Sequence, residues 1–337
     1  MPDCSWDLFM QLLRAGLWEE DLRLTGTPSA ACWEQLLSMS RIQAVTGLLL
    51  RGITHLPKDQ LPPAAIRMRL LAEADEIERK NLEAGLAEKK VLAFFAERGL
   101  HPIVQKGSQA AKYYAEPLLR ESGDIDLYFP EETFSQAVAA VPHARMTPDG
   151  SALASFKGVT VEIHPRYFDL HLPADKLPPV PSLVGELLLY SSHILKHALG
   201  AGIGLKQLCD MARALAQTEG LYDKSAFETA LRNAGLLRWH RLLCSMLISD
   251  LGLDARYCLP GFVPCNPKPL RRIVRQRGNF GTANTARQKA LRSESAVVKK
   301  GATALSFLLH IPFSLRIAPG EAFATFRELT RGNLKNG

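Results

Sequence analysis

The stretch Gly123–Phe129 constrains the fold most strongly, because it places two aspartates two residues apart within an otherwise apolar run. Side chains alternate between the two faces of a β-strand, so Asp124 and Asp126 share one face while Ile125 and Leu127 point into a core. Carboxylates held against an apolar core carry a large desolvation cost unless a positive charge pairs with them. Mg²⁺ prefers oxygen ligands of this kind, so the segment predicts a cation site on one face of a sheet.

A glycine-containing turn precedes the two aspartates. The run His101–Gln105 predicts a short strand, and Gln109–Leu119 has the composition of a helix that follows it. Gly107 and Ser108 would lie at the strand-to-helix turn, where glycine lets the backbone approach a ligand and free N–H groups attract anions. We therefore expect this turn to hold phosphate groups. Two basic residues near the turn are candidates for binding the same anion: Lys106 and Arg120.

A third carboxylate lies in a second strand predicted at Val159–His164. Alternation buries Val161 and Ile163 and turns Glu162 and His164 toward the opposite face. If this strand pairs beside the aspartate strand, Glu162 completes a triad of acids. In a two-metal reaction such a residue holds one metal and helps an acceptor hydroxyl to lose its proton, while the other metal steadies the leaving pyrophosphate. The acids predict nucleotidyl transfer, with His164 as a supporting or packing residue rather than a general base.

Together these residues resemble the core of the DNA polymerase beta-like nucleotidyltransferase superfamily, whose signature is a Gly-Ser turn, an Asp-x-Asp strand and a later acidic residue. More narrowly, the chain is similar, over roughly residues 85 to 215, to a bacterial family labelled uncharacterised nucleotidyltransferase. The matching segments follow one another in the order of that family: Lys106-Gly107, Tyr113-Tyr114, Arg120, Asp124–Leu127, Val161–His164, Leu187–Tyr190, His193, His197 and Asp210.

The resemblance implies transfer of a nucleoside monophosphate from a nucleoside triphosphate to a hydroxyl, with release of pyrophosphate. Mg²⁺ or Mn²⁺ is the expected metal, and ATP is the expected donor because it is the commonest donor among such enzymes. The expected catalytic and metal-binding residues are Asp124, Asp126 and Glu162. The expected donor-binding residues are Lys106, Gly107, Ser108 and Arg120. The acceptor stays open among small molecules, proteins and RNA, because a fold does not fix its substrate.

Two other functions remain open from the sequence. One is a non-catalytic nucleotide- or RNA-binding module, and the other is a toxin-like transferase that acts on transfer RNA. The set of three acids favours an enzyme over a binding module, because carboxylates without a metal repel phosphate.

The chain carries a net charge of +7, and the excess of bases is concentrated toward its C-terminal end. Between residues 268 and 300 the single acid is Glu294, and the bases are Lys268, Arg271, Arg272, Arg275, Arg277, Arg287, Lys289, Arg292, Lys299 and Lys300. Such a segment suits salt-sensitive contact with RNA phosphates, but few aromatic residues are interleaved for base stacking. A solvated basic helix or a connecting segment is the alternative.

Two histidines and an aspartate downstream of the acids have no assigned function. His193 and His197 are four residues apart on a predicted helix, so they share a face, yet no glutamate follows His193 as in a metalloprotease. Packing, or contact with the acceptor, is therefore favoured over zinc binding. Asp210 suits a capping or pairing function, and the roles of all three residues stay open.

The predicted fold class is α+β, with a small mixed β-sheet, flanking helices, and N- and C-terminal helical regions. We expect an N-terminal helical region at 1–100, a nucleotidyltransferase core at 101–170, a helical domain at 171–256 and a basic C-terminal region at 257–337. The apolar spacing of helices is clearest in Trp6–Leu17, Ala31–Leu50, Pro63–Gly99, Leu183–Ala216 and Ser225–Leu251.

The six cysteines include no Cys-x-x-Cys pair, which is typical of reduced intracellular thiols. The first residues do not form a secretory signal, and no apolar run reaches the length of a membrane span. The sequence therefore predicts a cytoplasmic protein without a membrane span.

Overall fold

The computed structural model describes residues 6–147, 150–168, 170, 172, 176–199, 202–279 and 311–320. It divides into two compact units, Met1–Tyr167 and Phe168–Gly337. The first unit holds a five-stranded sheet among helices, and the described elements of the second unit are all helical. The predicted α+β class is thus confirmed, while the finer division into four regions stays a prediction.

The sheet is mixed, with strand order β1-β2-β5-β4-β3. Strand β2 (Ile125–Tyr128) pairs antiparallel with β1 (Ile103–Gln105) and parallel with β5 (Val159–His164). The sheet continues from β5 through antiparallel pairs to β4 (Ala152–Phe156) and β3 (Arg145–Met146). Strand β2, which contains Asp126, therefore lies beside the strand that contains Glu162.

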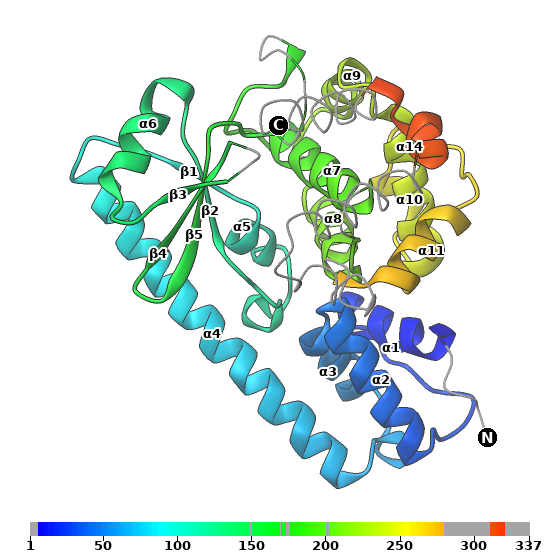
Figure 1. Cartoon of the computed structure of the whole chain (residues 1–337). Helices are drawn as coiled ribbons and strands as arrows, with labels where there is room; N and C mark the ends of the chain where they lie inside the picture. Colours follow the sequence, from blue (N-terminus) through cyan, green and yellow to red (C-terminus); the bar gives the residue numbers. More distant parts are fainter. Residues whose placement is uncertain are drawn as a thin grey trace. The chain divides into compact units, whose positions relative to one another are not determined.

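One face of this sheet is covered by two helices, α4 (Ala64–Ala96) and α6 (Glu131–Ala140), which lie on the same side of the strands in Figure 1. The buried side chains of this face come from alternate positions of β2 and β5 and from the two helices: Ile125, Leu127, Val161, Ile163, Val91, Phe95 and Ala137. Because strand side chains alternate, the residues between these apolar positions point to the other face. The acids of both strands therefore lie opposite the core.

The N-terminal helices are α1 (Trp6–Trp18), α2 (Ala30–Gln43) and α3 (Thr46–Thr54). The predicted helical segment Ala31–Leu50 is therefore two helices rather than one. Ala44 separates them, because it adopts the left-handed conformation at φ 54° and ψ 49° and its N–H bonds back to the last turn of α2. This conformation is uncommon for alanine and ends a right-handed helix.

Helices α1 and α3 approach each other closely at two glycines. A Cβ atom at Gly16 would lie 2.1 Å from the carbonyl oxygen of Leu48, and one at Gly52 would lie 1.9 Å from that of Leu12. Both obstructing atoms belong to the backbone, so a rotamer change cannot relieve the overlap. Glycine at these positions is therefore required for this helix pair to pack.

The helix predicted at Gln109–Leu119 is much shorter than expected. Helix α5 (Gly107–Ala111) ends within one turn and a half, and the 3₁₀ turn η2 (Pro117–Leu119) follows it. Pro117 lacks an N–H group and disfavours the helical conformation of the residue before it, so Glu116 has φ −117° and ψ 83°. The chain between β1 and β2 is consequently a loop with two short helical turns.

The second unit consists of helices in its described residues: α7 (Leu183–Leu199), α8 (Leu205–Gln217), α9 (Lys224–Asn233), α10 (Leu237–Leu251), α11 (Lys268–Arg277) and α14 (Ile311–Ile317). Trp239 of α10 is fully buried and donates its indole N–H to the carbonyl oxygen of Ser191 on α7, at 2.9 Å. Among the described residues, no helix is both long enough and apolar enough to cross a bilayer.

A buried histidine lies in the core of this unit. His240 packs its ring against Phe227 and places Nε2 3.3 Å from the sulfur of Cys244. No hydrogen-bond partner for its Nδ1 occurs among the described residues. Burial disfavours the charged imidazolium and lowers the pKa of His240 from 6.5 to about 4.

Substitution of the two kinds of helical glycine tests the packing of α1 on α3. Gly52→Ala is expected to destabilise the first unit by about 3 kcal/mol, because the new methyl group overlaps backbone atoms. Gly85→Ala on α4 is the matched control, since no atom lies within 4 Å of the new Cβ, and it should stabilise by about 1 kcal/mol. Urea unfolding measures both; equal effects of the two substitutions would contradict the close approach.

Acid should destabilise the second unit through His240. In the unfolded chain His240 takes up a proton as the pH falls through 6.5, whereas in the folded chain it stays neutral down to about pH 4. The unfolded state therefore binds more protons in this window, and the free energy of unfolding should fall by about 3 kcal/mol from pH 7 to pH 4. Urea unfolding followed by circular dichroism across this range should show a smaller fall in His240→Leu, and an identical fall would exclude His240 as the cause.

Candidate active site

Two of the three predicted acids, Asp126 and Glu162, come together on adjacent strands. Asp126 of β2 lies directly opposite Glu162 of β5 in the parallel register, and both point away from the apolar core. His164, two residues further along β5, shares this face. The ligand atoms of Asp126, Glu162 and His164 all lie within 4.8 Å of one another. Within the described part of the chain, this is the single group of three side chains with the composition and spacing of metal ligands.

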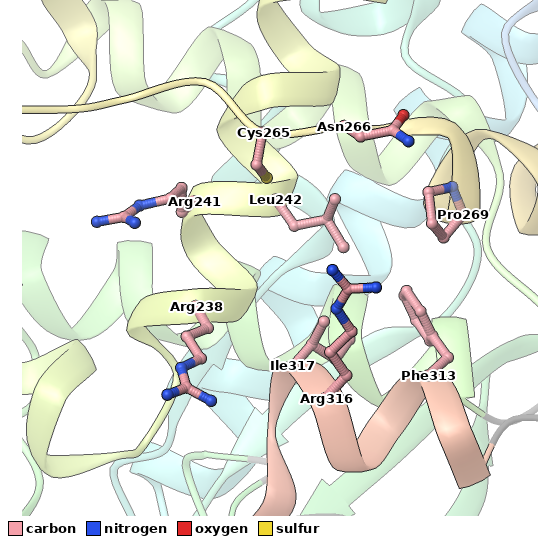
Figure 2. Close-up of a pocket in the computed structure, with 9 residues that line it drawn as sticks. All are labelled: Arg238, Arg241, Leu242, Cys265, Asn266, Pro269, Phe313, Arg316 and Ile317. Carbon is pink, nitrogen blue, oxygen red and sulfur yellow. The ribbon is translucent and has the colours of Figure 1, made fainter.

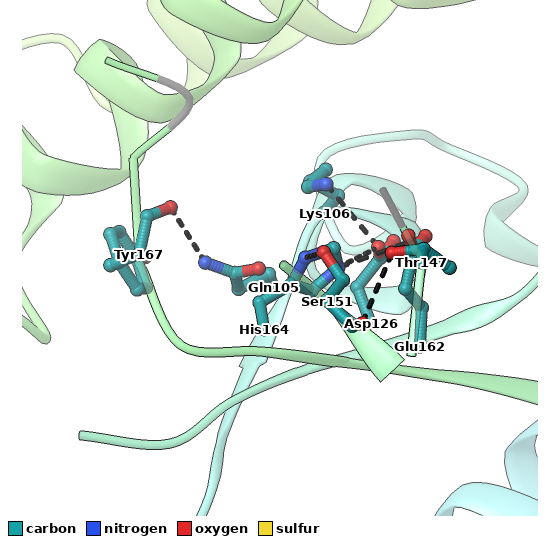
Figure 3. A network of polar contacts seen from close by, with 8 residues as sticks. All are labelled: Gln105, Lys106, Asp126, Thr147, Ser151, Glu162, His164 and Tyr167. Carbon is teal, nitrogen blue, oxygen red and sulfur yellow. Dashed lines mark hydrogen bonds and ion pairs between the residues drawn. The ribbon is translucent and has the colours of Figure 1, made fainter. Parts of the chain in front are cut away.

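Hydrogen bonds at both ring nitrogens fix the orientation of His164. Its Nε2 lies 2.8 Å from Oδ1 of Asp126, and its Nδ1 lies 3.2 Å from Oγ of Ser151 (Figure 3). Nε2 also lies 3.8 Å from Oε2 of Glu162. A neutral ring that donates from Nε2 to Asp126 accepts from the Ser151 hydroxyl at Nδ1. His164 therefore connects the carboxylate to Ser151, immediately before β4.

Lys106 joins the same group from the end of β1. Its Nζ lies 3.2 Å from Oδ1 of Asp126. Its backbone has φ 48° and ψ −131°, a conformation that L-residues rarely adopt. Such strain persists only where the surrounding structure holds it, and it is concentrated at functional sites. The strained turn directs the ammonium group of Lys106 onto the acids.

The neighbouring residue Gln105 secures the end of β1. Its side-chain N–H group donates to the carbonyl oxygen of Tyr167 at 2.6 Å, and the residue is buried. This bond joins β1 to the segment that follows β5 (Figure 3). This hydrogen bond holds the backbone immediately before Lys106 in place.

Burial and neighbouring charges both act on the carboxyl group of Glu162. Its pKa is raised, first by burial and also by the nearby carboxylates of Asp126 and Asp124, while His164 and Lys106 act in the opposite direction. Like charges directly opposite each other on adjacent strands are destabilising. A cation between the acids would relieve this repulsion.

Asp124 lies immediately before β2, and its side chain is exposed. It is outside the group of three close ligand atoms, although its charge raises the pKa of Glu162. A Cβ atom at Gly107 would lie 3.6 Å from the carbonyl oxygen of Asp124. The glycine turn therefore lies close to the start of the aspartate strand.

The structure places the other two predicted donor-binding residues in local contacts. Ser108 donates its hydroxyl hydrogen to Oε2 of Glu88 on α4, at 2.7 Å. Arg120 is buried, and its Nη1 lies 3.4 Å from Oγ of Ser122. These contacts direct Ser108 toward α4 and Arg120 toward the loop before β2.

The residues present fit a divalent cation. Carboxylate oxygens are the preferred ligands of Mg²⁺ and Mn²⁺, and an imidazole nitrogen suits softer divalent metals. Asp126 and Glu162 supply adjacent carboxylates, and the exposed Asp124 lies immediately before β2. His164, through its bond to Asp126, either contributes a nitrogen ligand or holds that carboxylate in place.

Sequence patterns did not place Ser151 or Thr147 at the site. The main-chain oxygen of Ser151 accepts hydrogen bonds from the hydroxyl and the N–H group of Thr147, at 3.0 and 2.9 Å. No local pattern signals this contribution, because it depends on the pairing of β4 with β5. For His164 a signal was present, since alternation had already turned it to the face of Glu162.

Downstream residues have separate environments. The rings of His193 and His197 pack edge to face, with centroids 4.3 Å apart, and Asp210 is buried. Arg271, one of the bases considered for RNA contact, pairs with the buried Asp250 through its Nε at 2.7 Å from Oδ2. Most of the basic stretch after Asn279 lies outside the described residues. The roles of these residues stay open.

Comparison with known proteins gives one match. A family model described as "Uncharacterised nucleotidyltransferase" matches residues 29–248, which include every predicted site residue. No curated protein matches the chain. The match covers well over half of the sequence and extends at both ends beyond the segment in which the resemblance was recognised. The chain therefore belongs to the uncharacterised nucleotidyltransferase family.

Proposed function

We propose that this protein transfers a nucleoside monophosphate from a nucleoside triphosphate, with ATP as the first candidate, to an acceptor hydroxyl. The observation that carries the proposal is the register that sets Asp126 opposite Glu162. The family assignment supports a nucleotidyl-transfer role. Neither observation identifies the acceptor, which we leave among small molecules, proteins and RNA.

In the proposed reaction the acceptor oxygen forms a bond to the α-phosphorus, and the bond between that phosphorus and the bridging oxygen of pyrophosphate breaks. The acceptor hydroxyl loses its proton, and pyrophosphate leaves with the bonding electron pair. A divalent cation held by Asp124, Asp126 and Glu162 would neutralise phosphate charge and lower the pKa of the acceptor hydroxyl. Mg²⁺ suits a set of three carboxylates, and Mn²⁺ is the second candidate.

Glu162 is proposed to assist the loss of the acceptor proton. Its carboxylate is partly buried and lies opposite Asp126, beside the cation that the two residues would hold. His164 and Ser151 act as positioning residues in this scheme. Their hydrogen bonds restrict the rotation of the Asp126 carboxylate, and a preorganised charge costs no reorganisation during the reaction.

Lys106 is proposed to exchange partners when the donor binds. In the structure its ammonium group neutralises Asp126. A cation at the acids would replace that charge, and Lys106 would then be available to the donor phosphates beside Gly107 and Ser108. Arg120, buried in the loop before β2, is the fourth proposed donor-binding residue. The strained backbone at Lys106 supports the proposal that Lys106 binds the donor phosphates.

Removal of the carboxylates should abolish transfer without unfolding the protein. Asp126→Asn and Glu162→Gln are each expected to reduce transfer from α-labelled nucleotide by about 10²-fold or more, because preorganised charge stabilisation is lost. Asp124→Asn should also reduce transfer. Release of pyrophosphate, or incorporation of the α-label into an acceptor, measures the effect.

The control for these substitutions is Asp75→Asn, which removes an exposed carboxylate from α4 in the same unit. It should leave transfer unchanged. Calorimetric titration with ATP, CTP, GTP and UTP, each with Mg²⁺, identifies the donor beforehand. Retained turnover in the Asp124→Asn, Asp126→Asn double variant would overturn the proposed roles of the acids. Nucleotide binding by the unsubstituted protein without any turnover would instead support a binding module.

Substitution of Lys106 should have opposite effects on metal and nucleotide. Lys106→Met removes the ammonium group that lies 3.2 Å from Asp126, so Mn²⁺ binding without nucleotide should become several-fold tighter. Binding of the metal–nucleotide complex should weaken by about tenfold, because a charged phosphate contact is lost. Paramagnetic resonance of free Mn²⁺ and calorimetry with the nucleotide measure the two constants. Weaker binding of both ligands would indicate that Lys106 supports the fold of the site rather than exchanging partners.

A further inference from the structure

Helix α4 carries large apolar side chains on the side that faces solvent. Four of them are between 45 and 67 % exposed: Met68, Leu71, Leu82 and Leu86. Met68 follows the buried Ile66 by two residues, which is about half a turn, so the exposed and the buried side chains occupy opposite sides of the helix. A surface helix usually has one apolar stripe, which packs on the core. The second stripe on α4 therefore has no function in the packing of the first unit.

The four exposed residues form one continuous line. Met68 and Leu71 are three residues apart, Leu82 and Leu86 are four apart, and residues at these spacings are neighbours on a helix face. Met68 and Leu86 are separated by about five whole turns, so the two pairs share that face. Figure 1 shows α4 as one uninterrupted helix between the N-terminal helices and the sheet. Apolar residues gathered in this way, unlike scattered ones, mark a contact surface.

Two opposite charges lie on the same line, between the apolar pairs. Asp75 is four residues after Leu71, and Arg79 is three residues before Leu82. No ion pair of the Asp75 carboxylate occurs among the described residues. Arg79 pairs with two glutamates of its own helix, and its side chain is still 56 % exposed. These six positions, which we call the α4 stripe, are thus apolar at both ends and charged at the centre.

We propose that the α4 stripe binds the α4 stripe of a second copy of this chain, with the two helices antiparallel. A two-fold axis level with Ile77 would set Met68 of each copy opposite Leu86 of the other. The same axis would set Asp75 opposite Arg79, and symmetry would make each of these contacts twice. The acid without an ion pair would then gain a base, and the exposed apolar side chains would be buried.

The central charges select the antiparallel arrangement. In a parallel pair of helices Asp75 would lie against Asp75 and Arg79 against Arg79, and like charges brought together in this way are unfavourable. Polar residues within an apolar seam are known to fix the register and orientation of paired helices. The α4 stripe is therefore complementary to itself in one orientation only.

The proposed contact leaves the candidate active site open. Val91 and Phe95 pack α4 on the apolar face of the sheet, whereas Asp126 and Glu162 lie on the other face. The α4 stripe lies on the side of the helix opposite Val91 and Phe95. A second copy would therefore approach the first unit from the side away from the acids.

Sedimentation equilibrium of the full chain tests the proposal. The mass should rise from that of one chain toward that of two between about 1 and 100 µM, because a contact of this size holds a weak dimer. Leu82→Glu should weaken association at least about tenfold, since the symmetric contact buries the new charge twice. Leu221→Glu is the matched control. It makes the same change at an exposed leucine of the second unit and should leave association unchanged.

A pair of charge variants tests the antiparallel register. Asp75→Arg sets base against base at the centre of the contact, and Arg79→Asp sets acid against acid, so each variant alone should associate at least about tenfold more weakly. In an equimolar mixture the mixed dimer has acid opposite base at both positions, so association should return. Misfolding of either variant could not produce this recovery.

Three outcomes would overturn the proposal. A chain that keeps the mass of a monomer at about 100 µM would leave the α4 stripe to the second unit or to a different protein. Equal losses in Leu82→Glu and Leu221→Glu, or association that neither charge variant weakens, would place the contact elsewhere on the chain. A mixture of the charge variants that does not recover association would exclude the pairing of Asp75 with Arg79.

Discussion

The parallel pairing of β2 with β5 places Asp126 directly opposite Glu162, and the chemistry of the first unit depends on this register. A shift of one residue would turn Asp126 and Glu162 into the core and bring Leu127 and Ile163 out, because strand side chains alternate with a period of two. The buried apolar face against α4 and α6 excludes such a shift. Packing of the core on one face of the sheet therefore fixes the positions of the acids on the other face.

Concentrated negative charge on the other face has a cost, and the surrounding residues reduce it. Lys106 places an ammonium group on Asp126, and His164 hydrogen-bonds the same oxygen while Ser151 holds the far side of its ring. The pKa of Glu162 nevertheless stays raised, with burial as the main cause. Without a cation, Lys106 and His164 offset part of the negative charge of the acids. A bound divalent cation would offset more of it, as the proposed transfer reaction requires.

The second unit has a different chemical character in its described residues. Its helices surround a largely apolar core, in which Trp239 and His240 are buried. Arginines of α10 and α14 and several apolar side chains line one hollow of this unit (Figure 2). Arg271 of α11 is instead paired with Asp250, so the excess of bases in this part of the chain is not one uniform surface. Ion pairs within the unit therefore determine which arginine and lysine side chains can contact a ligand.

Sequence patterns predicted the β2 and β5 strands, the shared face of their acids and the extent of the long helix α4, because alternation and helical spacing are local properties. Local patterns did not predict the helix boundary at Ala44 or the early end of α5, because each depends on the backbone conformation of a few residues. Sequence patterns could not predict contacts between distant segments of the chain. The pairing of Lys106 with Asp126, the contact between Ser151 and His164, and the hollow beneath Arg316 each join segments far apart in the chain. The sequence by itself therefore determined which residues carry the chemistry and which face they share, whereas tertiary structure decided their partners, since register and helix packing follow from burial of the whole core.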